Sequence, residues 1–411
     1  MTFTRKSANL TPIQDTVFAI VKLAKEDKEK NGNDIVTDAT IGSLADENGN
    51  LVAYDNVFKH YDKIDARTKA AYAASFIGNA NYRDNVYKWV CQDHCDKLNH
   101  SVIATVGGSG AVSMTISNIL DKGQTVILPD IAWGSYKLMA SQFELDCAYY
   151  QMFDENNNFN MESFKNTISN ISKKQDKILV VINDPCHNPT GYTLTVAQWQ
   201  EIVSFINEVS KEVPCVILND IAYIDYSYDL DHVRDYMECY NELSTNAMAI
   251  IAFSCSKTLT SYGLRCGAAI LLTKDATSLR ETEIVFEKSA RSVWSNIPND
   301  AMENFAWVVS DNKQQFLAEK KQYVDLLKKR SDIFIQEAND AKLPIYPYKE
   351  GFFVTIKVDN DIRDKYHQAL MDEHIYTVCV NKGIRVAICS LPVTKAKGLA
   401  YKMKEILEKV A

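Results

Sequence analysis

Short apolar runs alternate with stretches of helical periodicity through the middle of this 411-residue chain. Each run is rich in Val, Ile and Leu and is bounded by turn residues, as expected for a buried strand. Strands that alternate with helices predict an α/β fold with a mostly parallel central sheet between helices. The runs are residues 101–106, 125–128, 178–182, 215–218, 248–253 and 268–272.

Polar or glycine-rich sequence directly follows four of these runs. Residues 107–110 read Gly-Gly-Ser-Gly, residues 183–185 read Asn-Asp-Pro, residues 219–220 read Asn-Asp, and residues 254–257 read Ser-Cys-Ser-Lys. In open α/β sheets, ligands bind outside the carboxyl ends of the strands. We therefore expect the four loops to converge on one site.

The chain is longer than one hydrophobic core usually organises, which predicts more than one domain. The sequence pattern changes after residue 310. Residues 314–338 predict a long charged amphipathic helix, and strands are predicted near residues 352–358 and 384–389. We predict an N-terminal segment, residues 1–50, that packs with the small domain. A large domain, residues 51–310, holds the sheet, and residues 311–411 form the smaller α+β domain.

Composition excludes several kinds of partner. Lys and Arg total 45 against 53 Asp and Glu, a net charge of −8, and no basic block offers a face for nucleic acid. No apolar run reaches the roughly 18 residues of a membrane span, and residues 1–10 lack the apolar core of a signal peptide. Ten cysteines at irregular spacings favour free thiols in a reducing compartment. We expect no nucleic-acid or membrane partner and a cytoplasmic location.

Cys91, His94, Cys95 and His100 lie close together in the sequence, which raises the question of a zinc site. No second Cys/His pair follows at the usual distance. The alternative is a helix with ordinary packed and surface thiols, which we favour, so we expect no metal.

Lys257 follows an apolar run, and Arg265 comes eight residues later. A lysine at a strand end, partly desolvated and beside another cation, has a lowered pKa, which suits an amine that condenses with a carbonyl compound. The alternative is a solvated surface lysine. The neighbouring Ser254 and Arg265 favour the reactive amine.

The Gly-rich residues 107–110 precede an apolar-periodic stretch, so backbone N–H groups and a helix dipole offer a seat for an anion. The sequence matches neither the P-loop nor the dinucleotide fingerprint. Ser109, Ser254 and Arg265 could complete the seat around a phosphate dianion. The alternative is a plain tight turn.

Asp220 ends an apolar run, and Tyr223 follows three residues later. A carboxylate beside a pyridine nitrogen keeps that ring protonated and makes it an electron sink. Tyr223 and the amide of Asn188 are suited to hydrogen-bond an oxygen on the same ring, and Arg385 offers a planar fork for a carboxylate. The alternatives are a helix cap for Asp220 and a surface position for Arg385.

In this order, the motifs resemble those of class I/II aminotransferases of fold type I, closest to the aspartate/aromatic branch. They are Asn188-Pro189-Thr190-Gly191, Asp220-Ile221-Ala222-Tyr223, Ser254-Cys255-Ser256-Lys257 with Arg265, and Arg385. The resemblance spans about residues 40–391. It implies a pyridoxal 5'-phosphate cofactor that is bonded covalently to Lys257.

The resemblance implies a role for each residue. The catalytic residues are Lys257, which moves the substrate's proton, Asp220, which meets the pyridine nitrogen, and Tyr223. The cofactor-binding residues are these three with Gly108, Ser109, Trp133, Asn188, Ser254 and Arg265. The substrate-binding residues are Gly42, Trp133, Asn188, Arg291 and Arg385, which takes the α-carboxylate.

Three segments match the aspartate/aromatic branch in particular. Trp133 resembles the tryptophan stacked on the cofactor ring, and Ile41-Gly42 resembles the segment that closes over substrate. Arg291 is similar to the arginine that reaches across a dimer to the distal carboxylate of a dicarboxylic substrate. The resemblance thus implies a homodimer with shared active sites.

The chain departs from the branch at supporting positions. Tyr136 stands where the branch has a histidine that supports the aspartate, and a second supporting histidine is replaced near Asn183. Tyr72 is the candidate for the tyrosine that a neighbouring subunit donates to the phosphate.

The resemblance implies an enzyme that transfers the amino group of an acidic or aromatic amino acid to a 2-oxo acid, such as 2-oxoglutarate, by a ping-pong mechanism. Two alternatives stay open, because a cofactor and a lysine alone do not fix the reaction. One is a C–S β-lyase or decarboxylase on the same fold. The other is a non-catalytic module that binds pyridoxal phosphate.

Overall fold

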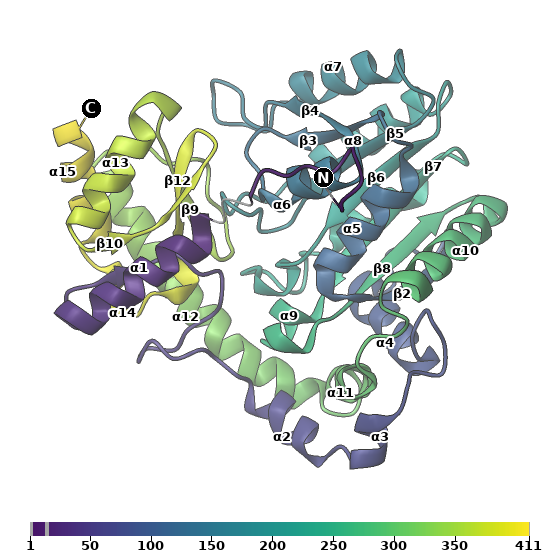
Figure 1. Cartoon of the computed structure of the whole chain (residues 1–411), viewed down its shortest axis with the longest axis horizontal. Helices are drawn as coiled ribbons and strands as arrows, with labels where there is room; N and C mark the ends of the chain where they lie inside the picture. Colours follow the sequence, from purple (N-terminus) through teal and green to yellow (C-terminus); the bar gives the residue numbers. More distant parts are fainter. Residues whose placement is uncertain (1–2, 13–15, 411) are drawn as a thin grey trace.

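A seven-stranded sheet lies at the centre of the larger part of the molecule in the computed structural model, which describes residues 3–12 and 16–410 (Figure 1). Its strand order is β2-β8-β7-β6-β5-β3-β4. Strand β8 is antiparallel to both neighbours, and the other strands share one direction. The strands are β2 (Asn99–Val106), β3 (Thr125–Pro129), β4 (Asp146–Tyr150), β5 (Ile178–Asn183), β6 (Cys215–Asp220), β7 (Ala247–Ser254) and β8 (Cys266–Thr273).

This arrangement confirms the predicted α/β fold with a mostly parallel sheet. All six predicted runs are strands of the sheet. Strand β4 was not predicted, because it lies at the edge of the sheet. Of its five residues, two are exposed, two are partly buried and only one is fully buried. It therefore lacks the continuous apolar run that marks a central strand.

Each central strand fills two cores because successive side chains point to opposite faces of the sheet. In β5, Leu179 and Val181 face one hydrophobic cluster, whereas Ile178, Val180 and Ile182 face the other. Helices α5 (Gly107–Ile119), α6 (Ser135–Gln142) and α10 (Ala276–Val293) pack into the first cluster. Helices α4 (Ala80–Cys91), α7 (Met161–Ser172), α8 (Val196–Val209) and α11 (Asn299–Val309) pack into the second.

The C-terminal part is built around a long helix and a small antiparallel sheet of order β11-β12-β9. Strand β1 pairs with β10, which joins the N-terminal segment to this part, and Figure 1 shows α1 beside it. The helices are α1 (Thr16–Asn31), α12 (Lys313–Asp340), α13 (Asn360–Asp372), α14 (Val393–Ala396) and α15 (Leu399–Val410). The strands are β1 (Thr37–Asp38), β9 (Phe353–Lys357), β10 (Ile375–Tyr376), β11 (Val378–Val380) and β12 (Gly383–Ala387).

Short helices complete the described chain. They are α2 (Asp55–Lys63), α3 (Ala66–Ala70), α9 (Cys255–Thr258) and the 3-10 helices η1 (Ile224–Tyr226), η2 (Asp235–Glu242), η3 (Tyr262–Leu264) and η4 (Ile388–Ser390). Within the described ranges, no helix combines the length and the apolar character that crossing a membrane requires.

Arg330 of α12 ties the N-terminal segment to the C-terminal part. Its side chain is fully buried, and its Nη1 donates to the carbonyl oxygens of Ala45, at 2.8 Å, and Cys389, at 3.0 Å. Its Nη2 donates to Glu47 at 2.6 Å. One guanidinium therefore satisfies backbone acceptors from two segments that lie far apart in the sequence.

We expect Arg330→Met to lower the free energy of unfolding by about 2–4 kcal/mol, because it leaves buried acceptors without a charged donor. Urea denaturation followed by circular dichroism measures this loss. Lys321→Met on the same helix is the control, since its exposed pair with Asp325 contributes about 0–1 kcal/mol. Equal effects of the two substitutions would contradict the role given to Arg330.

Candidate active site

A cavity of about 230 Å³ lies where strands β5, β6 and β7 end. The loops predicted to converge do so here, because parallel strands bring their carboxyl ends to one edge of the sheet. All nine residues predicted to bind a cofactor line it. The lining residues are Gly108, Ser109, Trp133, Tyr136, Asn183, Asn188, Asp220, Ala222, Tyr223, Ser254, Ser256, Lys257, Tyr262 and Arg265.

One end of the cavity is an anion seat at the N-terminus of α5. Gly107 has a φ of +65°, and a Cβ atom there would lie 2.4 Å from Nη2 of Arg265, so only glycine allows this approach. Arg265 Nη1 donates to the Ser256 hydroxyl at 3.0 Å and to the Tyr262 carbonyl at 2.9 Å. A guanidinium, serine hydroxyls and the first N–H groups of a helix suit a phosphate group.

Asp220, at the end of β6, is a buried carboxylate held by two donors. The Tyr136 hydroxyl donates to its Oδ2 at 2.6 Å, and the Ala222 amide donates to its Oδ1 at 3.1 Å. Burial raises the pKa of Asp220, whereas these hydrogen bonds and the charge of Lys257 act in the opposite direction. Asn183 donates to the Asp220 carbonyl at 2.7 Å. Tyr136 and Asn183 thus occupy the supporting positions where the chain departs from the aspartate/aromatic pattern.

Lys257 lies in α9, directly after β7. Burial lowers the pKa of its amine from 10.5 to about 8, with further lowering from Arg265 and Arg385, while Asp220 acts in the opposite direction. Its Nζ lies 4.6 Å from the ring centre of Tyr262 and 5.7 Å from that of Tyr223. The structure therefore provides an amine that loses its proton near neutral pH, as a nucleophile requires.

Arg385, in β12, lies next to the cavity rather than in its lining. Its Nη2 donates to the Thr40 carbonyl at 2.8 Å and its Nη1 to Asn188 Oδ1 at 3.3 Å. Its buried Nε has no hydrogen-bond partner among the described residues. A buried guanidinium with a free donor is suited to a carboxylate ligand, because unpaired buried donors are costly. The guanidinium stacks 4.4 Å from the ring centre of Phe353.

Gly42 lies close to the same Phe353 ring. A Cβ atom at Gly42 would be 2.6 Å from Phe353 Cζ and 3.7 Å from the Tyr223 hydroxyl. The N-terminal segment therefore reaches the mouth of the site, while Ile41 beside it is exposed.

Two predicted residues lie away from the cavity of their own chain. Arg291, near the end of α10, is exposed, donates to the Ser295 hydroxyl at 2.5 Å and stacks 4.7 Å from the ring centre of Phe76. Tyr72 is 86% exposed. Cys91 and Cys95, considered above as zinc ligands, are buried free thiols.

The sequence did not predict three lining residues: Ser256, Tyr262 and Ala222. Ser256 and Tyr262 lie within the segment between Ser254 and Arg265, so their closeness to Lys257 in sequence was an available signal. Ala222 has no reactive group. It lines the cavity because it lies between Asp220 and Tyr223 in the sequence, and both of these residues line the cavity.

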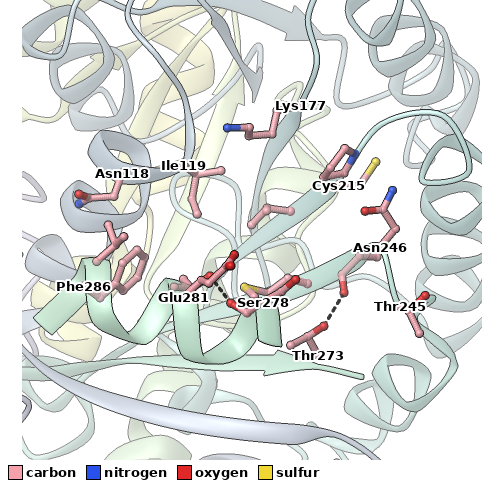
Figure 2. Close-up of a pocket in the computed structure, with 16 residues that line it drawn as sticks. Asn118, Ile119, Lys177, Cys215, Thr245, Asn246, Thr273, Ser278, Glu281 and Phe286 are labelled. Carbon is pink, nitrogen blue, oxygen red and sulfur yellow. Dashed lines mark hydrogen bonds between the residues drawn. The ribbon is translucent and has the colours of Figure 1, made fainter. Parts of the chain in front are cut away.

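A larger cavity, of about 380 Å³, lies at the opposite ends of the same strands (Figure 2). Cys215 and Met248, at the beginnings of β6 and β7, line it together with Glu281 and Phe286 of α10. It contains none of the predicted site residues. We place the chemistry in the smaller cavity, because the reactive amine, the buried carboxylate and the anion seat meet there.

Comparison with known proteins connects this geometry to a family. Residues 35–401 match the model for aminotransferase class I and II. The structure of an aminotransferase from Anaerococcus prevotii is similar, with a TM-score of 0.95, 31% identity and 99% of both chains covered. A tyrosine aminotransferase of Rhizobium meliloti is 27% identical over 290 residues, 69% of this chain and 70% of that protein.

A third relative carries the cofactor. The aromatic-amino-acid aminotransferase from Burkholderia pseudomallei, solved with covalently bound pyridoxal phosphate, has a TM-score of 0.78. It is 20% identical to this chain, and the match covers 99% of this chain and 100% of that one.

The lowered pKa of Lys257 predicts a distinctive pH profile in the cofactor-free protein. We expect its acetylation by acetic anhydride to increase through pH 8 and then level off, because the neutral amine is the reactive form. Mass spectrometry of the peptide that contains Lys257 measures the rate. Exposed Lys59 is the comparison, because its hydrogen bond to Asp55 raises its pKa above 10.5. The reactivity of Lys59 should therefore still increase at higher pH. Parallel profiles for the two lysines would show that Lys257 is not perturbed.

Proposed function

We propose, since this chain belongs to the aminotransferase class I and II family, that it transfers the amino group of an acidic or aromatic amino acid to a 2-oxo acid such as 2-oxoglutarate. The observation that carries this proposal is the meeting of the Lys257 amine, the Asp220 carboxylate and an anion seat in one cavity. The relatives named for tyrosine and aromatic amino acids support aromatic donors. Arg291 supports acidic donors, because it resembles the arginine that binds the distal carboxylate of a dicarboxylic substrate.

The cavity fits pyridoxal 5'-phosphate, the cofactor of this family. When bound, the cofactor supplies an aldehyde and a cationic ring that withdraws electrons from the substrate's α-carbon. We propose that Ser109 and Arg265, with Gly108 and Ser254, bind its phosphate. The close approach of Gly107 and Gly108 to Arg265 and Ser254 supports this, because a side chain at either glycine would fill the seat.

The same cavity supports a proposal for the residues that contact the cofactor ring. We propose that Asp220 holds the proton of the ring nitrogen, that Asn188 and Tyr223 hydrogen-bond the ring oxygen, and that Trp133 covers the ring. Asp220 suits this role because the Tyr136 hydroxyl and the Ala222 amide favour its ionised form.

Lys257 is the residue that moves the proton. Its amine, with a pKa of about 8, both accepts and returns a proton near neutral pH. In our proposal, Lys257 takes the proton from the substrate's α-carbon while Arg385 holds the α-carboxylate. The segment at Gly42 packs against Phe353 and excludes water from the substrate.

Family membership favours amino transfer over the two other functions considered from the sequence. A C–S β-lyase or decarboxylase does not need a second arginine for a distal carboxylate, and a non-catalytic module does not need a buried reactive lysine. The proposal therefore gives both residues a role: Lys257 as the reactive amine and Arg291 as the contact for a distal carboxylate.

We further propose a homodimer, in which Arg291 serves the partner's site. Its exposed position against the exposed ring of Phe76 supports this, because exposed apolar side chains beside a charged group are typical of interfaces. We divide each chain into residues 1–50, 51–310 and 311–411. The ten free cysteines support a cytoplasmic location.

The substrate proposal predicts a selective loss in Arg291→Ala. We expect kcat/KM for aspartate and glutamate to decrease about ten- to a hundredfold, because a charged hydrogen-bonded pair contributes about 1.5–3 kcal/mol. Phenylalanine and tyrosine should change little. A panel of these donors with 2-oxoglutarate measures both, and Arg280→Ala, another exposed arginine of α10, is the control.

Mixing Lys257→Ala, which we expect to be inactive, with Arg291→Ala, which we expect to be impaired for acidic donors, tests the shared site. Lys257→Ala and Arg291→Ala subunits, unfolded together and refolded, form hybrids in which one site has both residues. We expect aspartate turnover to return partly on mixing. If equal losses occur for acidic and aromatic donors, or if no activity returns, Arg291 does not have the proposed role.

The support of Asp220 predicts a weaker cofactor complex in Tyr136→Phe. We expect the Kd for pyridoxal phosphate to increase roughly ten- to a hundredfold, because a lost hydrogen bond to a charged group costs about 1.5–3 kcal/mol and raises the pKa of Asp220 further. Absorbance titration of the cofactor-free protein gives this Kd. Tyr150→Phe, which removes a buried hydroxyl bonded to the Val181 carbonyl at 3.2 Å, is the control. Equal affinities in the two variants would exclude this role.

A further inference from the structure

The turn that carries Lys257 ends in carbonyl groups that other elements satisfy. Helix α9 is only four residues long, so its last carbonyls have few partners of their own. The Tyr226 hydroxyl donates to the Lys257 carbonyl at 3.0 Å. The Nζ of Lys320, from α12, donates to the Thr258 carbonyl at 2.7 Å. The backbone at Lys257 and Thr258 is thus held by side chains of other elements.

Lys320 is an unusual residue for such a contact because it is 0% exposed. Its ammonium lies among three aromatic rings, 4.7 Å from the centre of Tyr226, 5.2 Å from Phe316 and 5.5 Å from Tyr54. Burial lowers its pKa to about 8. Burying an ammonium is costly unless it is paired and hydrogen-bonded, and lysine is rarely found at such positions.

A buried acid completes the arrangement. Asp225 accepts hydrogen bonds from the Thr258 hydroxyl at 2.6 Å, from Arg234 at 2.6 Å and from the Trp89 indole at 3.0 Å. Burial opposes its ionisation, but the charges of Arg234 and Lys320 and these hydrogen bonds keep its pKa below the ordinary value. Thr258 is therefore held at both its carbonyl and its hydroxyl, one residue after Lys257.

We propose that Lys320 is a positioning residue for Lys257, an inference that rests on the proposed function. When the cofactor is bound, the Lys257 amine would hold its aldehyde carbon, with loss of water, and would give up that carbon to the incoming amine of the substrate. Its side chain has to move while its backbone stays in place. Lys320 fixes the Thr258 carbonyl from α12, and Asp225 fixes the Thr258 hydroxyl from η1. Lys320 itself touches neither cofactor nor substrate.

The inference predicts that removing the Lys320 ammonium weakens the binding of a cofactor that bonds covalently to Lys257, and leaves the binding of one that does not unchanged. Pyridoxal phosphate bonds to Lys257, whereas pyridoxamine phosphate has no aldehyde and uses only the anion seat and the ring contacts. In Lys320→Met, which keeps the length of the side chain but removes the ammonium, we expect the Kd for pyridoxal phosphate to increase about tenfold. The Kd for pyridoxamine phosphate should remain that of the wild type. Equilibrium titration of the cofactor-free protein with each compound gives both values.

Controls separate positioning from general destabilisation. Leu327→Ala, a fully buried position on the same helix, should leave the ratio of the two Kd values unchanged. If Lys320→Met does not fold, Thr258→Val, which removes only the hydroxyl bonded to Asp225, should show the same selective loss. A proportional loss for both compounds, or no loss for either, would overturn the positioning role. Failure of the wild type to bind pyridoxal phosphate covalently would instead overturn the proposed function.

Discussion

The site is arranged around two ionisable groups in one cavity, the partly buried Lys257 and the buried Asp220. Burial acts on both groups in the direction of neutrality, lowering the pKa of the amine and raising that of the carboxyl. For the amine this is useful, since a neutral lysine is nucleophilic. For the acid it is a cost, which the hydrogen bonds from the Tyr136 hydroxyl and the Ala222 amide offset only in part, so that its pKa stays raised. A transaminase needs a neutral lysine and an ionised aspartate in the same cavity. The two residues have different hydrogen-bond partners, which favours this combination.

The sheet makes this arrangement possible. Strands β6 and β7 are neighbours, and both end at the same edge, so Asp220 and the turn after Ser254 meet there. The antiparallel β8 begins at this edge, with Arg265 just before it. A Cβ atom at Gly267 would lie 2.5 Å from the Gly107 carbonyl carbon, which shows how closely the two backbones approach. That approach brings the Arg265 guanidinium to the beginning of α5, where an anion is favoured.

The residues proposed to bind the cofactor were predictable because most of them lie at the end of a strand or shortly after it. Their supports were not. Tyr136 was recognised only as a departure from the family pattern, and the structure shows that it donates directly to Asp220. Tyr262 contacts the Leu44 amide through its hydroxyl, a contact between segments that no local pattern connects. Arg291 and Tyr72 lie outside the cavity of their own chain, a position that their neighbours in the sequence do not reveal.

The sequence by itself determined the strand pattern, the α/β class and the chemistry placed at the strand ends, because these depend on residues that are neighbours in the chain. Only the tertiary structure decided the pairs that tune the site. Tyr136 meets Asp220 across 84 positions, Arg385 meets Asn188 across 197, and Lys320 meets Thr258 across 62. Hydrophobic periodicity specifies which face of an element is buried, but many side chains share that face. Which of them touch is fixed by how the elements pack, and packing depends on the whole chain.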